Sequence, residues 1–296
     1  MEFFVYYFFN TLNMIGLLVL VGLGIAIIFG LMDVMNLAHG EFMTIGAYTL
    51  HFVHSIGGGF WLGVALAPIV GMIVGIIIER TIIRYLYDFT LKAFLVTMGL
   101  SLIIQKVIQL IFGVSPQRVD TPNLLKGPVI LLDVIYPTYR LFMIAVSFVI
   151  ILAIIIVYRR SSFGLNLRAV IQNKEVAKAL GVNAERTYQL AFGGGAGLAA
   201  IAGALVAPMT VISAHMGLRY LGKAFFVVIV GGTGTIAGVL VGSTFIGGLE
   251  TLFNEFVDFA LSPALVLILA IIVVRFRGGG LIKGYGRSQE DYVKAF

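Results

Sequence analysis

The chain has 296 residues, of which 60% are hydrophobic and only 11% are charged, with a formal charge of +6 and no cysteine. A water-soluble protein of this length needs more polar side chains to cover its surface, so the composition excludes a soluble globule and predicts an integral membrane protein. The absence of cysteine also excludes a disulfide framework and a thiolate metal site.

The apolar stretches are long enough to cross a bilayer several times. A hydrocarbon core of roughly 30 Å needs about 20 apolar residues per helix, so the uncharged stretches supply about six to eight crossings. In chain order, we predict apolar membrane segments over residues 5–30, 42–52, 60–78, 93–113, 141–158, 189–211, 224–249 and 259–274. The first is expected to be a retained helix, because no basic region or small-residue cleavage site marks a signal peptide. We therefore expect an all-α integral membrane protein with one polytopic domain over residues 1–296.

The basic residues orient these segments. Lys and Arg gather in the loop 159–188 and in the tail 275–296, and the positive-inside rule places both in the cytoplasm. The same rule explains this charge without nucleic acid as a partner. The loop between residues 113 and 141 holds four prolines and few cations, so it is expected outside. Counting the membrane crossings back from these loops predicts that the first helix runs from the cytoplasmic side to the outer side.

Two polar or glycine-rich stretches interrupt the apolar pattern. The first is "MNLAHGEF" (residues 35–42), which contains Asn36, His39, Gly40 and Glu41. The second is "VGGTGTIAG" (residues 230–238), which contains Gly231, Gly232, Thr233 and Gly234. Both are typical of broken or re-entrant membrane segments, and we expect these eight residues to line the substrate pathway. Each half of the chain then contains a helix, a broken helix and a second helix, and the two halves cross the membrane in the same directions. This pattern predicts parallel pseudo-repeats.

Glu41 allows two interpretations. An acid inside a membrane protein faces a partner or a cavity, and Glu41 follows Gly40 at the expected start of a half-helix, where free backbone N–H groups favour an anion. Asp33 and Asn36 are expected to cap the half-helix on the side where the chain enters it. These residues either satisfy the broken backbone and each other, or line a transport path. His39 is expected to be a hydrogen-bonding neighbour.

Catalytic and metal sites are not indicated. His51 and His54 lack a nearby acid, and a metal site needs several ligands at defined spacing. A nucleophile elbow and a Walker A phosphate loop are both missing from the sequence. We therefore expect no enzyme and no cofactor in this chain, and the energy for its activity must come from another chain or from a gradient.

Three further features have structural or interaction roles. The glycine pairs Gly71/Gly75, Gly193/Gly197 and Gly238/Gly242 fit close helix packing. Lys106 lies in the fourth crossing and is expected to extend toward the outer face. The stretch "LRAVIQNKEVAKALGVN" (residues 167–183) predicts a short amphipathic helix that stops at Gly181. Such a helix either lies at the membrane surface or docks in a groove of a soluble partner.

The chain resembles the branched-chain amino acid type of ABC-transporter permease, the first of its two permease subunits. Three ordered stretches carry the resemblance: "GLGIAIIFGLMDVMNLAHGEFMTIGAY" (residues 22–48), the basic loop, and "FFVVIVGGTGTIAGVLVGS" (residues 225–243). The resemblance implies that residues of the basic loop couple to the ATPases. These coupling residues are Arg168, Asn173, Glu175, Ala177, Leu180 and Gly181.

The resemblance also implies the partners. These are a homologous second permease subunit, two cytoplasmic ATPases that bind ATP and Mg, and an extracytoplasmic solute-binding protein. The chain would lie in the lipid bilayer of a bacterial or archaeal cytoplasmic membrane and import branched-chain or other neutral amino acids. Urea or short amides are the nearest alternative substrates. A passive small-solute channel and an ion-coupled transporter are more distant alternatives.

Overall fold

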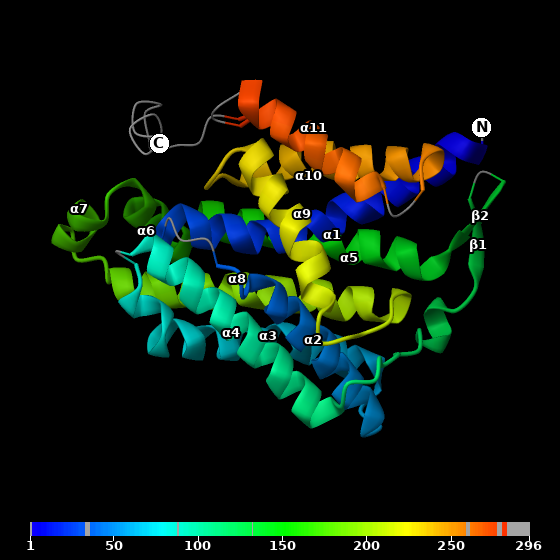
Figure 1. Ribbon diagram of the computed structural model, residues 1–296, viewed down its shortest axis with the longest axis horizontal. Helices are drawn as coiled ribbons and strands as arrows, with labels where there is room; N and C mark the ends of the chain where they lie inside the picture. The colour runs from blue at the N-terminus through cyan, green and yellow to red at the C-terminus, as the bar shows by residue number, and fades with distance from the viewer. Residues whose placement is uncertain are drawn as a thin grey trace.

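The computed structural model describes residues 2–32, 36–87, 89–131, 133–258, 261–276 and 280–282. The fold in Figure 1 is a bundle of helices with one small hairpin of strands. The helices are α1 (Glu2–Met32), α2 (His39–Ser55), α3 (Gly59–Thr81), α4 (Thr90–Phe112), α5 (Thr138–Arg160), α6 (Ser162–Gln172), α7 (Lys174–Ala179), α8 (Ala184–Val206), α9 (Met216–Gly231), α10 (Ile236–Phe256) and α11 (Ser262–Phe276). Three short 3₁₀ turns cover Ile83–Tyr85, Asn123–Leu125 and Ala207–Met209.

Six helices in the described part of the chain are long and apolar enough to cross a membrane: α1, α3, α4, α5, α8 and α10. This confirms an all-α integral membrane protein. Helices α1 and α8 lie at the centre, since 72% and 78% of their apolar windows are buried, whereas only 11% of the α5 window is buried. Helices α4 and α5 therefore present most of their apolar side chains outward, as expected for surfaces that face lipid.

Glycines let the central helices touch backbone to backbone. A Cβ built on Gly75 would lie 3.3 Å from the Cα of Gly193, and one on Gly71 would lie 3.4 Å from the Cα of Gly197. The two predicted pairs thus face each other across α3 and α8. Lipid tails are as apolar as side chains, so close van der Waals contact is what holds such helices together.

The expected outer loop forms an antiparallel hairpin of β1 (Pro128–Leu131) and β2 (Val134–Pro137). This hairpin lies at one end of the bundle, and α7 lies at the other end (Figure 1). Under the positive-inside rule the α7 end is cytoplasmic, because α7 lies in the basic loop.

The prediction for the direction of the first helix is wrong. Asn10 accepts hydrogen bonds from Tyr136 (3.0 Å) and Arg140 (2.6 Å), and Asn13 donates to the Arg140 carbonyl (3.1 Å). The N-terminal part of α1 therefore lies at the hairpin end, and α1 runs parallel to α5. The direction differs because α2 carries the chain back toward the hairpin end, where Tyr48 packs on Phe112. Because α1 runs in the opposite direction, it does not match the first helix of the second proposed repeat. The parallel repeat therefore stays a prediction.

The amphipathic helix predicted over residues 167–183 is two helices. Asn173 has extended backbone angles, ends α6 and caps α7 by accepting from the backbone N–H groups of Glu175 and Val176 (both 3.0 Å). Asparagine side chains compete with helical backbone bonds in this way, which favours a new helix start. Gly181, with φ of +86°, ends the turn after α7, as predicted.

Candidate functional site

The first break is closed by side chains. Asn36 accepts from the backbone N–H of Ala38 (3.0 Å), and the backbone N–H of His39 donates to the Asn36 carbonyl (3.2 Å). Asn36 therefore fixes the turn that leads into α2, but it does not cap the helix as expected, because the N-cap residue is Ala38 and no side chain bonds to the first turn as a cap. Asp33, the other expected cap, lies outside the described residues.

Glu41 is fully buried and does not cap the helix. Its Oε1 accepts from Ser101 Oγ (2.8 Å) and from Gln105 Nε2 (2.7 Å), both on α4. Gln105 also donates to Ser101 (3.1 Å), so the three side chains form one network. The other carboxylate oxygen, Oε2, has no hydrogen-bond partner among the described residues. The geometry matches the interpretation that Glu41 satisfies neighbouring polar groups, and it makes Glu41 the polar link between α2 and α4.

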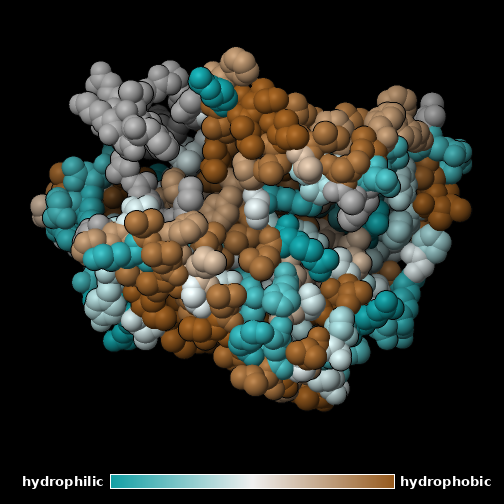
Figure 2. Space-filling view, viewed as in Figure 1, coloured by the Kyte–Doolittle hydropathy of each residue, from teal (hydrophilic) through white to brown (hydrophobic). Residues whose placement is uncertain are grey.

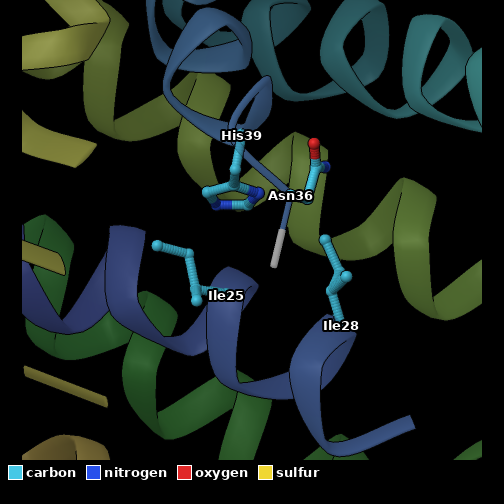
Figure 3. Close-up of a pocket in the computed structure, with 4 residues that line it drawn as sticks. All are labelled: Ile25, Ile28, Asn36 and His39. Atoms are coloured by element: carbon cyan, nitrogen blue, oxygen red, sulfur yellow. The ribbon is translucent and has the colours of Figure 1, made fainter. Parts of the chain in front are cut away.

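His39 lies beside a small pocket that it lines with Ile25, Ile28 and Asn36 (Figure 3). The side chain is 1% exposed, and neither ring nitrogen makes a hydrogen bond of normal geometry among the described residues, although the ring lies near the Val21 backbone of α1. Its ring packs on Gly24 of α1, where an added Cβ would lie 2.8 Å from the ring. The Nδ2 of Asn36 also has no partner. Because buried polar groups are usually paired, these three unpaired nitrogens mark an unusual site at the first break.

The second break is closed by backbone. Gly232 and Gly234 have φ of +113° and +76°, values that residues with a side chain rarely adopt. Thr235 then caps α10 by accepting from the Gly238 N–H (3.0 Å). A Cβ on Gly231 would lie only 1.9 Å from the Gly238 carbonyl oxygen. The chain near the C-terminus also contributes, since Leu281 donates to the Val230 carbonyl (2.7 Å) and Ile282 to the Gly231 carbonyl (3.0 Å).

Helix α1 connects the two breaks. His39 packs on Gly24, and a Cβ on Gly30 would lie 3.0 Å from the Cα of Gly234. Residues 24 and 30 are about 9 Å apart along the helix axis. The structure therefore places both predicted break sites along the last turns of the same helix.

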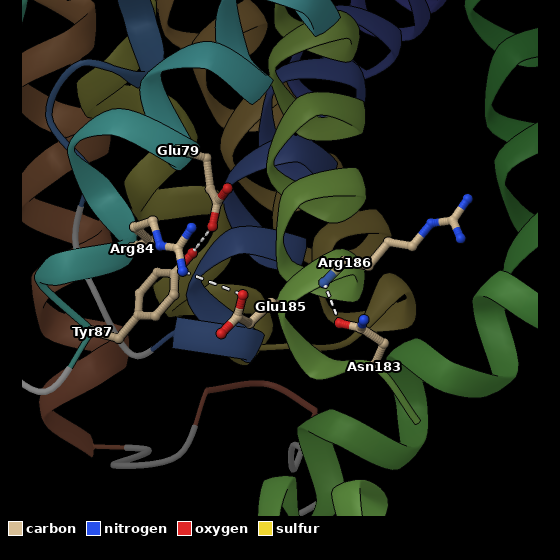
Figure 4. Close-up of polar contacts among 6 residues, drawn as sticks. All are labelled: Glu79, Arg84, Tyr87, Asn183, Glu185 and Arg186. Carbon is tan, nitrogen blue, oxygen red and sulfur yellow. Dashed lines mark hydrogen bonds and ion pairs between the residues drawn. The ribbon is translucent and has the colours of Figure 1, made fainter. Parts of the chain in front are cut away.

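At the α7 end, polar contacts tie three helical segments together (Figure 4). Tyr87 donates to the Glu79 carboxylate, and Arg84 pairs with Glu185 of α8 (3.2 Å). Asn183 caps α8 by accepting from the Arg186 N–H (2.9 Å). Burial and the bond to Glu79 raise the pKa of the Tyr87 hydroxyl, so this group stays protonated and donates.

The predicted coupling residues do not all face outward. Leu180 and Val176 are 78% and 53% exposed, whereas Ala177 is buried against the chain itself. Glu175 is exposed and pairs with Lys178 (3.5 Å). Val176 and Leu180 therefore supply the apolar surface of α7 that is open to a partner.

Arg168 has a contact within the chain. It donates to the carbonyl of Tyr158 and lies over the Tyr158 ring, 5.0 Å from its centroid. Cations are favoured near the last carbonyls of a helix. Arg168 therefore joins α6 to the end of α5.

Two polar contacts inside the bundle were not predicted from the sequence. Ser101 was not singled out, although it shares a face of α4 with Gln105. The ion pair between Lys223 of α9 and Glu250 of α10 was also missed. The signal for the pair is that the two opposite charges flank the predicted apolar segment 224–249, and a charge in a membrane protein usually has a nearby partner.

Comparison with known proteins identifies the family. The family model for the permease component of branched-chain amino acid transport systems matches residues 7–275. The chain belongs to this family. It is therefore a multi-pass membrane protein of the branched-chain amino acid ABC permeases. No solved structure matches the fold closely enough to be significant.

The similar curated proteins of this family are matched over nearly their whole length. The chain is 28% identical to the high-affinity branched-chain amino acid transport system permease protein LivH of Escherichia coli K12, covering 98% of each chain. It is 25% identical to BraD of Pseudomonas aeruginosa, covering 96% of each. A probable LivH of Methanocaldococcus jannaschii is 27% identical over 94% of this chain and 90% of the relative.

Proposed function

We propose that this permease is the membrane subunit of an ATP-driven importer for branched-chain or other neutral amino acids. It works with a second permease chain, two cytoplasmic ATPases and an extracytoplasmic solute-binding protein, and it lies in the cytoplasmic membrane of its cell. It is a transport subunit without catalysis of its own, because ATP and Mg are bound by the ATPases. The observation that carries this proposal is the family match over residues 7–275, together with relatives that are named as branched-chain amino acid permeases.

The exposed apolar side chains of α7 support the ATPase partner. A helix capped at both ends keeps its shape at the cytoplasmic face, and Val176 and Leu180 project from it, 53% and 78% exposed in the part of the chain that the structure describes. Apolar side chains on a short helix fit a groove on a soluble partner. ATP-driven closure of the ATPases would then move α7, and α7 would in turn move the adjacent helices α6 and α8.

Uptake by the complete complex tests the proposed substrate. The chain is co-expressed with its proposed partners, purified as a complex and placed in liposomes that hold ATP. We expect uptake of leucine, isoleucine or valine that depends on both ATP and the solute-binding protein. Uptake of urea or short amides with no uptake of these amino acids would overturn the substrate assignment. Uptake by the purified chain alone, without ATP, would overturn the importer.

A substitution on α7 tests the coupling. Leu180→Glu places a charge on the exposed apolar surface, so we expect the ATPases to be lost from the purified complex while the chain still inserts in the membrane. Leu124→Glu is a matched control, because Leu124 is 82% exposed in the loop that leads to the hairpin, at the opposite end of the bundle. Normal ATPase association in Leu180→Glu would contradict docking through α7.

A further inference from the structure

Helices α4 and α9 together present a polar surface that contains none of the residues of the two breaks. We call the five residues that form it the α4–α9 polar face: Lys106, Gln109, His215, Arg219 and Lys223. Gln109 accepts from Lys106 (3.0 Å) and lies 3.1 Å from the His215 ring nitrogen, so the face is continuous from one helix to the other. Figure 2 shows hydrophilic side chains in the middle of this side of the molecule, with hydrophobic surface around them.

Packing contacts place the α9 part of this face deep in the membrane. Gly195 is the midpoint of the spanning helix α8, and a Cβ on Gly24 would lie 2.6 Å from its carbonyl oxygen. The same Gly24 touches His39 at the start of α2. A Cβ on Gly217, at the start of α9, would lie 2.0 Å from the carbonyl oxygen of Gly40. Helix α9 therefore begins near the middle of the span, and it crosses the spanning helices steeply in Figure 1.

Among the described residues, two cations of the face have no carboxylate partner: Lys106, which bonds to the Gln109 amide, and Arg219. Lys223 is paired with Glu250, whose side chain is 5% exposed. Arg219 is exposed, and no carboxylate among the described residues lies within ion-pairing distance of it. A guanidinium at this depth is strongly disfavoured against lipid, so it faces water or an anion. Helix α9 also turns its positive N-terminal end toward the same level, which adds to the attraction for an anion.

We propose that Arg219 binds the carboxylate of the amino acid as it passes the middle of the membrane, and that the α4–α9 polar face lines the substrate path. This rests on the proposed import of amino acids. A planar guanidinium binds a carboxylate through two parallel N–H···O bonds, a geometry that lysine does not reproduce. Urea and short amides have no carboxylate, so the same residue would give the permease a preference for amino acids over these neutral solutes.

Cysteine accessibility tests whether the face is in contact with water. The chain has no cysteine, so a single Arg219→Cys substitution gives one reactive site. In the purified complex we expect a charged, membrane-impermeant thiol reagent to modify this cysteine. Phe148→Cys is the matched control, because Phe148 is 67% exposed near the middle of the peripheral helix α5 and is expected to face lipid and stay unmodified. If both cysteines fail to react, or react equally, Arg219 does not face an aqueous path.

Transport separates carboxylate binding from a structural role. We expect Arg219→Ala to lower the rate of leucine uptake about tenfold or more, and Arg219→Lys to restore part of it, because lysine keeps the charge without the bidentate geometry. Both variants should purify with the full set of subunits.

Three outcomes would overturn the proposal. Unchanged uptake by Arg219→Ala would show that the guanidinium does not bind substrate. Loss of the second permease chain from the Arg219→Ala complex would assign Arg219 to the contact between permease chains. Full activity of Arg219→Lys would overturn bidentate binding of the carboxylate by the guanidinium, because lysine cannot make it. Failure of the unsubstituted complex to import any amino acid is a different result, because it would refute the proposed function whatever Arg219 does.

Discussion

The break before α2 and the break before α10 both leave backbone groups without helical partners inside an apolar bundle, and the two are closed differently. At the first break Asn36 satisfies the backbone, and Glu41 reaches across to α4. At the second, two glycines with positive φ turn the chain, and backbone groups of residues 281–282 supply hydrogen bonds. The first break therefore depends on side-chain chemistry, whereas the second depends on backbone shape.

This difference predicts different tolerance to substitution. Side-chain networks accept a substitute that keeps the same acceptor or donor, because the surrounding backbone does not need to move. Backbone contacts between glycines accept no added atom, because the neighbouring helix must shift as a whole. The second break should therefore be the more sensitive to the smallest change in size, and the first to the loss of a polar atom.

The largest expected effect is at the second break. In Gly231→Ala the new methyl would overlap the Gly238 carbonyl, so α9 and α10 must separate. We expect a loss of about 3 kcal/mol or more in stability, as for severe overpacking. The measurement is the midpoint of thermal unfolding of the purified permease in detergent. Gly194→Ala in α8 is the control, because its Cβ would meet nothing within 4 Å; an equal loss in both variants would refute the close contact.

The network at the first break should respond to the loss of its acceptor. Glu41→Ala leaves Ser101 and Gln105 without their shared oxygen in a buried site, and we expect a loss of about 2 kcal/mol. Glu41→Gln keeps an acceptor oxygen, so we expect it to retain most of the stability and part of the ATP-dependent transport. The same unfolding midpoint, with uptake by the reconstituted complex, compares the two variants. A larger loss in Glu41→Gln than in Glu41→Ala would contradict the network.

Removing the helix cap at the second break should lower stability less than adding a methyl group there. Thr235→Ala deletes the hydroxyl that accepts from Gly238 N–H, and loss of such a cap costs about 1 kcal/mol. Thr235→Ser keeps the hydroxyl and should restore nearly all of the unfolding midpoint. If serine were as destabilised as alanine, the methyl group of Thr235, not its cap, would be the stabilising feature.

Hydropathy and glycine spacing predicted much of this architecture, including the spanning helices, both breaks and the facing pairs on α3 and α8. They could not predict that Glu41 bonds to Ser101 and Gln105, because these residues are distant in sequence and only the packing of α2 on α4 brings them together. They also reversed α1, since residues 1–32 carry no Lys or Arg to orient it. Arg219 was overlooked because its depth follows from the short, steep α9, which hydropathy does not reveal.

The smallest expected effect on stability is at His39, and it separates structure from function at the first break. His39→Leu removes two buried ring nitrogens that make no hydrogen bond of normal geometry. The nearby Val21 backbone keeps its bonds within α1, so we expect stability to change by no more than about 0.5 kcal/mol. His54→Leu, an exposed histidine near the other end of α2, is the matched control. If the unpaired nitrogens serve the proposed substrate path, uptake by the reconstituted complex falls in His39→Leu alone, while its unfolding midpoint stays at that of the control. Equal uptake in both variants would leave the ring with a packing role against Gly24, and the transport function of the first break would then rest on Asn36 and Glu41.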